Sequence, residues 1–494
     1  GTGTYVRTLT ITSGVIVAFR GNAGLHGLKN SGSSADESAS NYACSSSEQG
    51  NYTYIINGTL DLSYYAGSVF NLNTCSFAGN TQSVIVSVKN GGTLKLGNVV
   101  KMYTALAGQT ADIVTESGSN VEFASTLAQT LLLTTGSGTL PALSLNKLTL
   151  NNSNGLALSK PINITGVLVL TDGNITGNPV IMSGTTQQTI TANGNSIENL
   201  TVNNDAGVQG SPNISGLLTI TKGDILDYSN LSNVNILYNG TSAQTVNAGL
   251  TAVKNLTVNN AGGVSLAGSP TVNRTLTLTN GKLSLGNNNL TIWSTGSLST
   301  PNTNSYIVTN GTGMLIMNAA ASASTIFPVG TVSSFHPVTV NPSLSANFYI
   351  SVNEGNTPAL PATDATILPA KSLNRTWNIT PGIPVTATLT LGYNGSSDAN
   401  ASFDNSGADV ALMHNNTSGT WEYVGSGAVT PGIGTSTTKT ATFEGISSFS
   451  PFTVVNPGPG AVYTNTSGGT FSDIFRSKAT GNWNGTDTWE LYDA

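Results

Sequence analysis

The chain has 494 residues, of which 38% are hydrophobic and only 8% are charged, and its formal net charge is −6. The 17 Lys and Arg residues are scattered singly, which excludes the concentrated basic face that nucleic-acid binding requires. No apolar run approaches the ~18 residues needed to span a bilayer, and the start "GTGTYVRTLT" is no signal peptide, so we expect a mature or excised chain. Abundant Ser, Thr, Asn and Gly with recurring apolar positions are typical of regular β-structure.

Short strands with alternating apolar and polar residues are predicted from the N-terminus onward. They are "TLTITSGVIVAF" from Thr8, "YIINGTLDLS" from Tyr54 and "VIVSVKNGGTLKLGN" from Val84. The segment from Gly24 to Asn80 is less regular, and we interpret it as a decorated end or an insertion of the same structure.

Two cysteines, Cys44 and Cys75, lie in this N-terminal segment. Neither has a second Cys or a His nearby at metal-ligand spacing, which argues against zinc. We favour a disulfide between them over two buried thiols. A disulfide implies that the chain folds outside the cytoplasm.

Internal repeats begin near residue 147. "KLTLNN" and two copies of "NLTVNN" start at Lys147, Asn199 and Asn255. A second strand follows each of them: "LVLTDGNI" from Leu168, "LTITKGDI" from Leu218 and "LTLTNGKL" from Leu276. Each strand ends at an NN, DG, KG or NG turn. The repeat is therefore 50–58 residues long and contains several short strands.

Two architectures accommodate these repeats. Tight hairpins would give an antiparallel sandwich or propeller, whereas a solenoid would stack short strands in parallel. We favour the solenoid, because the strands recur with one polarity and each coil of a stack covers the apolar face of its neighbour. The all-β fold is thus predicted to start with a parallel β-solenoid over residues 1–315. The asparagine pairs are interpreted as ladders along the stack, as turn formers, or as both.

From residue 316 the strands become longer and are separated by Pro-rich turns. Seven or so strands, such as "HPVTVNPSL" and "FYISVNEG", predict an antiparallel β-sandwich over residues 316–457. Trp377 and Trp421 are expected to be core or edge-strand aromatics. "NPGPG" from Asn456 is a linker, because its prolines and glycines cannot continue a strand. Residues 458–494 are predicted to contain this linker and a C-terminal extension strand.

Several segments resemble one class of known proteins. "FPVGTVSSFHPVTV", "LNRTWNIT", "GISSFSPFTVV" and the closing "GNW…TW" pattern are similar to parts of large repetitive surface proteins of Bacteroidetes-type bacteria. The resemblance covers most of the chain. It implies export by the type IX secretion route and display on the surface of a Gram-negative cell, but no activity. The chain departs from the class in lacking a type IX sorting domain at its C-terminus, which we expect to be cleaved off or to lie further along the gene product.

In those proteins the "GNW…TW" strand runs on into a strand like "RTLTITSGVIVAF", which here begins at Arg7. The resemblance therefore implies that the last residues lead into a strand like the first. We favour addition of the tail as a strand to the N-terminal edge of the next copy or repeat, and the alternative is that the tail folds back and caps its own chain. The expected anchors are Phe471, Phe475, Trp483 and Trp489. The expected acceptor edge contains Thr4, Val6, Leu9, Ile11, Val15 and Val17.

Candidate catalytic residues are few. His26, His336 and His414 sit in no recognisable triad or metal-ligand spacing and are interpreted as turn or strand residues. Asp224 and Asp227 form the closest carboxylate pair of the repeats, and we interpret them as solvated turn residues rather than as a glycosidase pair. We expect no catalytic site, no metal site and no cofactor.

The favoured function is a structural subunit or repeat of an extracellular filament, whose partner is another copy of itself. The first alternative is a surface adhesin that binds glycans. In that case Tyr52, Tyr54, Tyr64 and Tyr65 would stack on sugars, unless they pack on the coil beneath. The second alternative is a polysaccharide-degrading enzyme, which rests on fold analogy alone.

Overall fold

The computed structural model of the chain is all-β, with a 3₁₀ helix at Pro369–Lys371. The structure describes residues 5–18, 28–31, 50–63, 69–73, 83–97, 99–104, 109–135, 142–231, 233–299, 301–309, 311–360, 369–405, 409–416, 418–430, 438–449, 451–456, 474–477 and 489–492. Contacts divide the chain into two units. Unit 1 contains Gly1–Asn318, Phe327–Phe335 and Asn347–Ser351, and unit 2 contains Ala319–Ile326, His336–Ala346 and Val352–Ala494.

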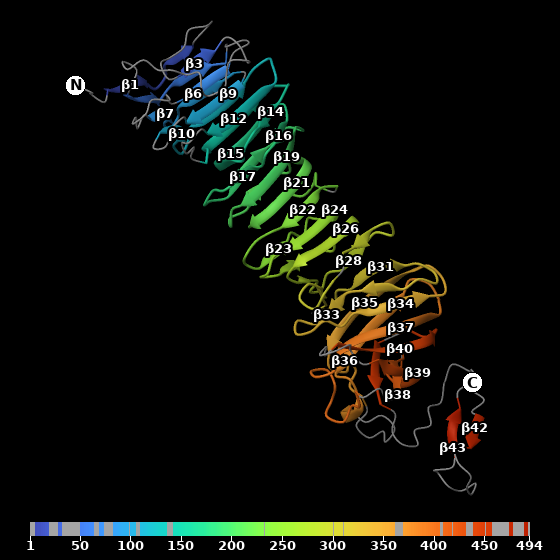
Figure 1. Cartoon of the computed structure of the whole chain (residues 1–494). Coiled ribbons are helices and arrows are strands. Elements are labelled where there is room, and N and C mark those ends of the chain that lie inside the picture. The colour runs from blue at the N-terminus through green and yellow to red at the C-terminus, as the bar shows by residue number, and fades with distance from the viewer. Residues whose placement is uncertain are drawn as a thin grey trace. The chain divides into compact units, whose positions relative to one another are not determined.

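Unit 1 begins with three rows of parallel strands, and one strand from each row makes one level of what we call the parallel stack (Figure 1). The first row is β1 (Tyr5–Ile11), β4 (Gly50–Ile56), β7 (Ser83–Val88) and β10 (Thr110–Thr115). The second row is β2 (Ile16–Ala18), β5 (Thr59–Leu62), β8 (Thr93–Leu96) and β11 (Asn120–Ala124). The third row is β6 (Val69–Asn73), β9 (Val99–Thr104), β12 (Gln129–Thr135), β14 (Leu156–Leu158) and β16 (Ile175–Gly177), with β3 (Leu28–Ser31) antiparallel to β6.

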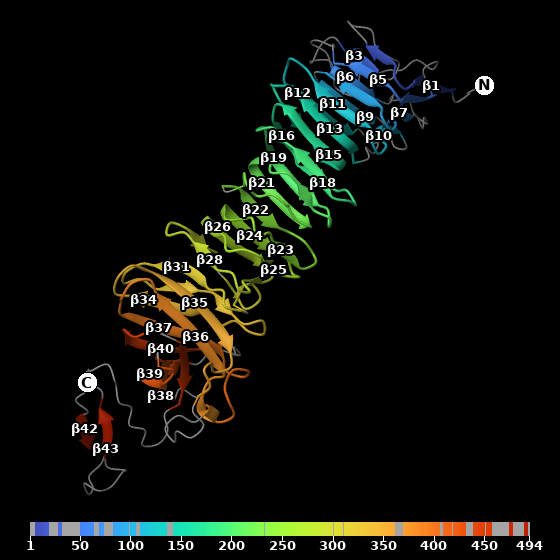
Figure 2. The same cartoon turned by 180° about the vertical axis from the view of Figure 1, so that it is seen from behind.

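The parallel pairing continues through the repeats, as both views show (Figures 1 and 2). The longer strands are β13 (Ser144–Asn151), β15 (Ile162–Asp172), β19 (Ser196–Asn203), β21 (Asn213–Lys222), β24 (Ala252–Asn259) and β26 (Thr271–Asn280). The shorter strands are β17 (Val180–Met182), β18 (Gln188–Thr191), β20 (Val208–Gln209), β22 (Asn235–Tyr238), β23 (Gln244–Val246), β25 (Val264–Leu266), β27 (Leu283–Ser284), β28 (Leu290–Ile292), β29 (Ser297–Leu298), β30 (Ile307–Val308) and β33 (Val329–Gly330). Three strands contribute residues to both units: β31 (Leu315–Ala319), β32 (Thr325–Phe327) and β35 (Ala346–Glu354).

Interior side chains of the parallel stack lie in columns, because each strand alternates inward and outward positions. In the repeat that begins at Asn199, Leu200 pairs with Leu218, which pairs in turn with Ile236. Ile236 pairs with Leu256, the equivalent of Leu200 in the next repeat, and all four side chains are buried. One sequence repeat therefore spans three levels. Burial of one such aliphatic side chain contributes about 1.5–3 kcal/mol relative to its exposure.

Buried amides connect neighbouring levels at the asparagine pairs. The second asparagine of each pair donates from Nδ2 to the Oε1 atom of a buried glutamine. These pairs are Asn152–Gln129, Asn204–Gln188 and Asn260–Gln244, with N···O distances of 2.9, 3.0 and 2.8 Å. The Oδ1 atom of Asn204 also accepts from the backbone N of Ala206, which closes a turn. The second asparagine of each pair thus closes a turn and also links two levels. Its buried side-chain partner is a glutamine rather than another asparagine.

A glycine in each repeat turn is required by close backbone packing. Gly223, in the "KG" turn, has a φ of 62°, a conformation that favours glycine. A Cβ atom there would lie 1.9 Å from the carbonyl oxygen of Asn204. Gly173 and Gly281 meet the equivalent asparagine carbonyls at 1.8 Å. The turn glycine therefore lets each turn approach the buried asparagine of the level before it.

The segment from Gly24 to Asn80 contains regular levels of the parallel stack, namely β4 and β5. Tyr52 and Tyr54 of β4 are 3% and 6% exposed. Of the two predicted alternatives, stacking on sugars is therefore wrong for these two residues and packing on the coil beneath is confirmed, because both occupy inward positions of the strand. Tyr64 and Tyr65 lie outside the described residues.

Unit 2 contains antiparallel strands. They pair in the continuous order β34–β37–β40–β39–β38–β41–β36. The strands are β34 (Val338–Pro342), β36 (Arg375–Pro381), β37 (Ala387–Asn394), β38 (Asp409–Asn415), β39 (Trp421–Thr430), β40 (Thr438–Ile446) and β41 (Pro451–Val455). Trp377 and Trp421 are both buried core residues. Trp421 packs with Leu360, Ala411, Met413 and Val455.

The tail contains a β-hairpin. β42 (Ile474–Ser477) pairs antiparallel with β43 (Trp489–Tyr492), and no other described strand joins their sheet. The sequence predicts one extension strand here. The described residues instead form two short strands, because their backbone N–H and C=O groups pair with each other.

Candidate functional site

Among the described strands, the first level of the parallel stack lies at the edge of its sheets. β1 pairs with β4 along its whole length, from Tyr5 opposite Gly50 to Ile11 opposite Ile56. No described strand pairs with the other side of β1, and β2 likewise pairs with β5 alone. Unpaired N–H and C=O groups along such an edge are a template for a further strand.

An interior side chain of this first level is partly uncovered. Leu9 pairs with Tyr54, and Tyr54 pairs with Val86, so the three residues share one inward column. Tyr54 and Val86 are buried, whereas Leu9 is 39% exposed. Leu9 therefore keeps apolar surface in water that one more level would bury.

The other predicted acceptor residues differ in exposure. Ile11 is buried, Val17 is half-buried and Val15 is exposed. Val6 takes part in the backbone pairing of β1 with β4. Ile16 was not predicted and is the most exposed large apolar residue of this region, at 70%. Apolar surface is thus concentrated around the turn that joins β1 to β2.

Two of the four predicted anchors lie in the C-terminal hairpin, Phe475 in β42 and Trp489 in β43. An isolated two-stranded hairpin is marginally stable at best in water. Among the described strands, β42 and β43 pair only with each other.

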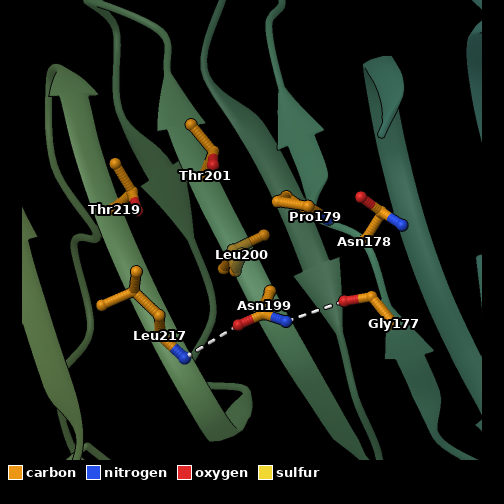
Figure 3. Close-up of a pocket in the computed structure, with 8 residues that line it drawn as sticks. All are labelled: Gly177, Asn178, Pro179, Asn199, Leu200, Thr201, Leu217 and Thr219. Atoms are coloured by element: carbon orange, nitrogen blue, oxygen red, sulfur yellow. Dashed lines mark hydrogen bonds between the residues drawn. The ribbon is translucent and has the colours of Figure 1, made fainter. Parts of the chain in front are cut away.

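A surface pocket of about 220 Å³ is lined by the end of β16, the connection from β16 to β17, and the paired strands β19 and β21 (Figure 3). No side chain that lines it is ionisable. The lining residues are Gly177, Asn178, Pro179, Asn199, Leu200, Thr201, Leu217 and Thr219. The pocket thus offers amide, hydroxyl and apolar groups only.

Asn199 is held in one orientation in this pocket. Its Nδ2 atom donates to the carbonyl of Gly177 at 2.7 Å, and its Oδ1 atom accepts from the backbone N of Leu217 at 3.2 Å (Figure 3). Thr201 and Thr219 are paired neighbours on β19 and β21. Neither threonine hydroxyl has a hydrogen-bond partner among the described residues, so both remain available to a ligand.

Asp224 is an enclosed carboxylate in the parallel stack. It accepts from the backbone N atoms of Ile225 and Asn247 at 2.8 and 3.1 Å, and from the hydroxyls of Tyr228 and Tyr238. Burial raises the pKa of Asp224 to about 6, although these four hydrogen bonds oppose the shift. Its acceptor capacity is used within the protein.

Asp227 differs from Asp224. It accepts from the backbone N of Ser229 at 3.0 Å, and this hydrogen bond lowers the pKa of Asp227. The prediction of a solvated turn residue fits Asp227. It is wrong for Asp224, because two buried tyrosine hydroxyls and two backbone amides replace water around that carboxylate. The two carboxylates therefore lie in different environments.

Unit 2 contains a buried cluster that the sequence does not reveal: His336, Arg375 and Asp398. Asp398 Oδ1 accepts from Arg375 Nη2 at 2.8 Å, and Oδ2 lies 2.7 Å from His336 Nε2. The same Nε2 atom lies 3.0 Å from Arg375 Nε. Only one of these two Nε2 contacts is a hydrogen bond at a time, because Nε2 either donates to the carboxylate or accepts from the guanidinium.

Opposing effects act on Asp398. Burial tends to raise its pKa, but hydrogen bonds from His336, the backbone N of Asn394 and the Ser397 hydroxyl hold the pKa below its ordinary value. His336 and Asp398 have no exposed surface and Arg375 is 5% exposed. His336 is therefore fully enclosed, and the Arg375–Asp398 pair compensates buried charges rather than presenting them to a substrate.

One sequence signal pointed toward this cluster. Arg375 lies in "LNRTWNIT" and His336 in "SFHPVTV", both among apolar strand residues. A charged residue in such a pattern indicates a buried partner. Asp398 carries no such signal, because it lies in the polar loop "NGSSDAN".

The remaining predicted residues are placed as follows. His414 lies in β38, where its Nε2 atom is 2.6 Å from the Ser448 hydroxyl, as expected for a strand residue. Six predicted residues lie outside the described residues: Thr4, His26, Cys44, Cys75, Phe471 and Trp483.

In the described part of the chain, no three His, Cys, Asp or Glu residues gather as a metal site. Within the same residues there is no helix of the length and apolarity that a membrane crossing needs. No known protein family, curated protein or solved structure matches the chain.

Proposed function

We propose that this chain is a structural subunit, or one repeat, of an extracellular filament on the surface of a Gram-negative cell that uses type IX export. Copies join head to tail: the C-terminal hairpin of one copy adds to the open edge of β1 in the next. In this proposal the parallel stack is a β-solenoid and the antiparallel unit is a β-sandwich. The partner is another copy of the same module, on a second chain or in tandem.

The observation that carries the proposal is the uncovered inward column at Leu9. A stack buries its inward residues by placing a level on each side, and the level of β1 has a described neighbour on one side only. An added strand would bury Leu9 and pair the free backbone groups of β1. Both effects favour association, since exposed strand edges otherwise cause unspecific aggregation.

The C-terminal hairpin supports the same proposal from the other end of the chain. Its two strands pair only with each other among the described strands, and in this proposal one of its outer edges receives β1 of the next copy. Trp489 and Phe475 supply large rings at this hairpin. The proposed contact joins two different surfaces of identical copies. Such a contact generates a filament unless the rotation from one copy to the next closes a ring.

The environment of Asp224 favours this structural proposal over a polysaccharide-degrading enzyme. Glycoside hydrolysis needs two carboxylates on either side of one bond. Asp224 is enclosed by Tyr228 and Tyr238, whereas Asp227 is bound to its own turn. We propose no catalytic role for either residue.

Deletion of residues 470–494 tests the joining contact. We expect the full chain to form filaments at high concentration and the truncated chain to remain as discrete particles, both seen by negative-stain electron microscopy. Truncated chains that form filaments of normal length would overturn the proposal.

A point variant tests the acceptor edge with less disturbance. Leu9→Lys places a charge on a side chain that is already 39% exposed, so the single copy should tolerate it, but burial in a filament should not. Leu226→Lys is a matched control, because Leu226 is also 39% exposed and lies within the stack. Leu9→Lys should abolish filaments and Leu226→Lys should not; equal behaviour would count against the edge of β1.

A further inference from the structure

We propose that the pocket lined by residues 177–179, β19 and β21 binds one unit of a neutral saccharide. This inference goes beyond filament formation and does not depend on it. It uses the geometry of Thr201, Thr219, Asn199 and Leu217 (Figure 3).

The electrostatics of the pocket select an uncharged ligand. None of the lining side chains is ionisable. Glu198 lies beside the pocket, where its Oε2 atom accepts from the backbone N of Gly177 at 2.8 Å. A carboxylate this close to a lining residue disfavours phosphate, sulfate and uronic acid groups, because like charges repel. A neutral, hydroxyl-rich ligand meets no such penalty.

The polar groups of the pocket match adjacent hydroxyls of a sugar ring. Thr201 and Thr219 present unpaired hydroxyls on paired strands, and each hydroxyl can donate once and accept twice. Asn178 uses its Nδ2 atom on the carbonyl of Leu158 at 3.2 Å, which leaves its Oδ1 atom as an acceptor. The fixed amide of Asn199 prevents local rearrangement when a ligand binds, which reduces the entropy cost.

The apolar part of the pocket suits the C–H face of the same ring. Leu217 is 36% exposed, and the half-buried Pro179 extends this uncharged wall. The volume of about 220 Å³ is below the ~300–1,000 Å³ typical of pockets for drug-sized ligands. The pocket is therefore sized for a single ring, either a free sugar or one unit of a longer glycan.

The next repeat provides a natural comparison. Asn199 pairs with Leu217 on β21, whereas its equivalent Asn255 pairs with Thr275 on β26. On the other side, Asn255 pairs with Asn235 of β22 and donates to its side chain at 2.7 Å. The apolar wall is thus replaced by polar residues. The equivalents of Thr201 and Thr219 remain, as Thr257 and Thr277.

The experiment uses the full chain and saturation-transfer NMR. The probes are methyl glycosides of glucose, galactose, mannose and N-acetylglucosamine, neutral oligosaccharides that end in these sugars, and glycerol as a simple polyol. Titration calorimetry then measures the affinity of the best probe. We expect at least one glycoside to bind and glycerol not to bind. A stronger signal from oligosaccharides than from glycosides identifies a glycan chain as the source.

Variants place the binding in the pocket. The double variant Thr201→Val/Thr219→Val should weaken binding about tenfold through the loss of two hydrogen bonds. The matched variant Thr257→Val/Thr277→Val should change it less than about twofold. Leu217→Thr, which copies the next repeat, should also weaken binding. Far-UV circular dichroism verifies that all variants fold. The proposal is overturned if no glycoside binds, if glycerol binds equally well, or if the two double variants behave alike.

Discussion

The parallel stack and the antiparallel unit satisfy their buried polar groups in different ways. The stack uses neutral amide pairs such as Asn204 with Gln188, and the same pair recurs from repeat to repeat. The antiparallel unit uses one cluster of ionisable groups, Asp398 with Arg375 and His336. A neutral pair suits a structure of near-identical levels. If one amide loses its partner, the cost in folding free energy is small compared with that of an isolated buried charge.

The difference also concerns distance along the chain. Asn204 and Gln188 belong to neighbouring levels, so each level can form its pair as it is added. His336 and Asp398 are separated by 62 positions, so their contact requires several strands of unit 2 to be in place. We infer that damage to the cluster affects unit 2 as a whole, whereas damage to one amide pair affects a few levels.

The largest expected effect is that of Arg375→Met. It removes the guanidinium from Asp398 and leaves a buried carboxylate with reduced compensation, which should lower the free energy of unfolding of unit 2 by about 3–5 kcal/mol. Urea unfolding followed by tryptophan fluorescence measures it, since Trp377 and Trp421 are buried in this unit. Arg274→Met, at an exposed position, should change stability by about 0.5 kcal/mol or less. Equal changes in stability from Arg375→Met and Arg274→Met would mean that the cluster of His336, Arg375 and Asp398 does not stabilise unit 2.

The second prediction contrasts Asp224 with Asp398 by pH. The pKa of Asp224 is raised from 3.8 to about 6 on folding, so the folded state binds more protons and the parallel stack loses stability as pH rises from about 4 to about 6, by roughly 3 kcal/mol at most. The pKa of Asp398 is lowered, so its contribution is present above pH 3.8 and is lost as pH falls through the lowered value.

Urea unfolding midpoints of the full chain and of Asp224→Asn, measured across this pH range, test the sign of the pH dependence of stability. The variant should flatten the decline between about pH 4 and pH 6, whatever its absolute stability. A decline of the same slope in both proteins would exclude Asp224 as its source.

The smallest expected effect is that of Asn204→Ala. The substitution leaves the Oε1 atom of Gln188 and the carbonyl of Thr186 without the donor they share, which should cost about 1–3 kcal/mol. Asn203→Ala is the matched control, because Asn203 belongs to the same "NN" pair but is exposed. Thermal unfolding of the two variants compares them directly. A larger loss of thermal stability from Asn203→Ala than from Asn204→Ala would contradict the assignment of Asn204 as the buried hydrogen-bonding residue of the pair.

The strands and repeats of unit 1 were readable from the sequence because their signals are local. Alternation at Leu200, Thr201 and Val202 predicts a strand, and the recurrence of "NLTVNN" indicates that one environment is repeated. The turn at Gly223 follows from the same rule, since a "KG" pair after a strand favours a turn. Trp377 and Trp421 were predicted to be core or edge-strand aromatics from their local strand pattern, and both are buried core residues.

Only the tertiary structure decided which partners these residues meet. Alternation along β4 does not say which face is inward, so Tyr52 and Tyr54 were as consistent with exposure as with burial. Asp224 became enclosed because Tyr228 and Tyr238 converge on it. His336 and Asp398 became partners because distant strands of unit 2 are paired. Local pattern determines the conformation of a segment, whereas burial, pKa and binding groups depend on contacts between segments, which no single stretch of sequence contains.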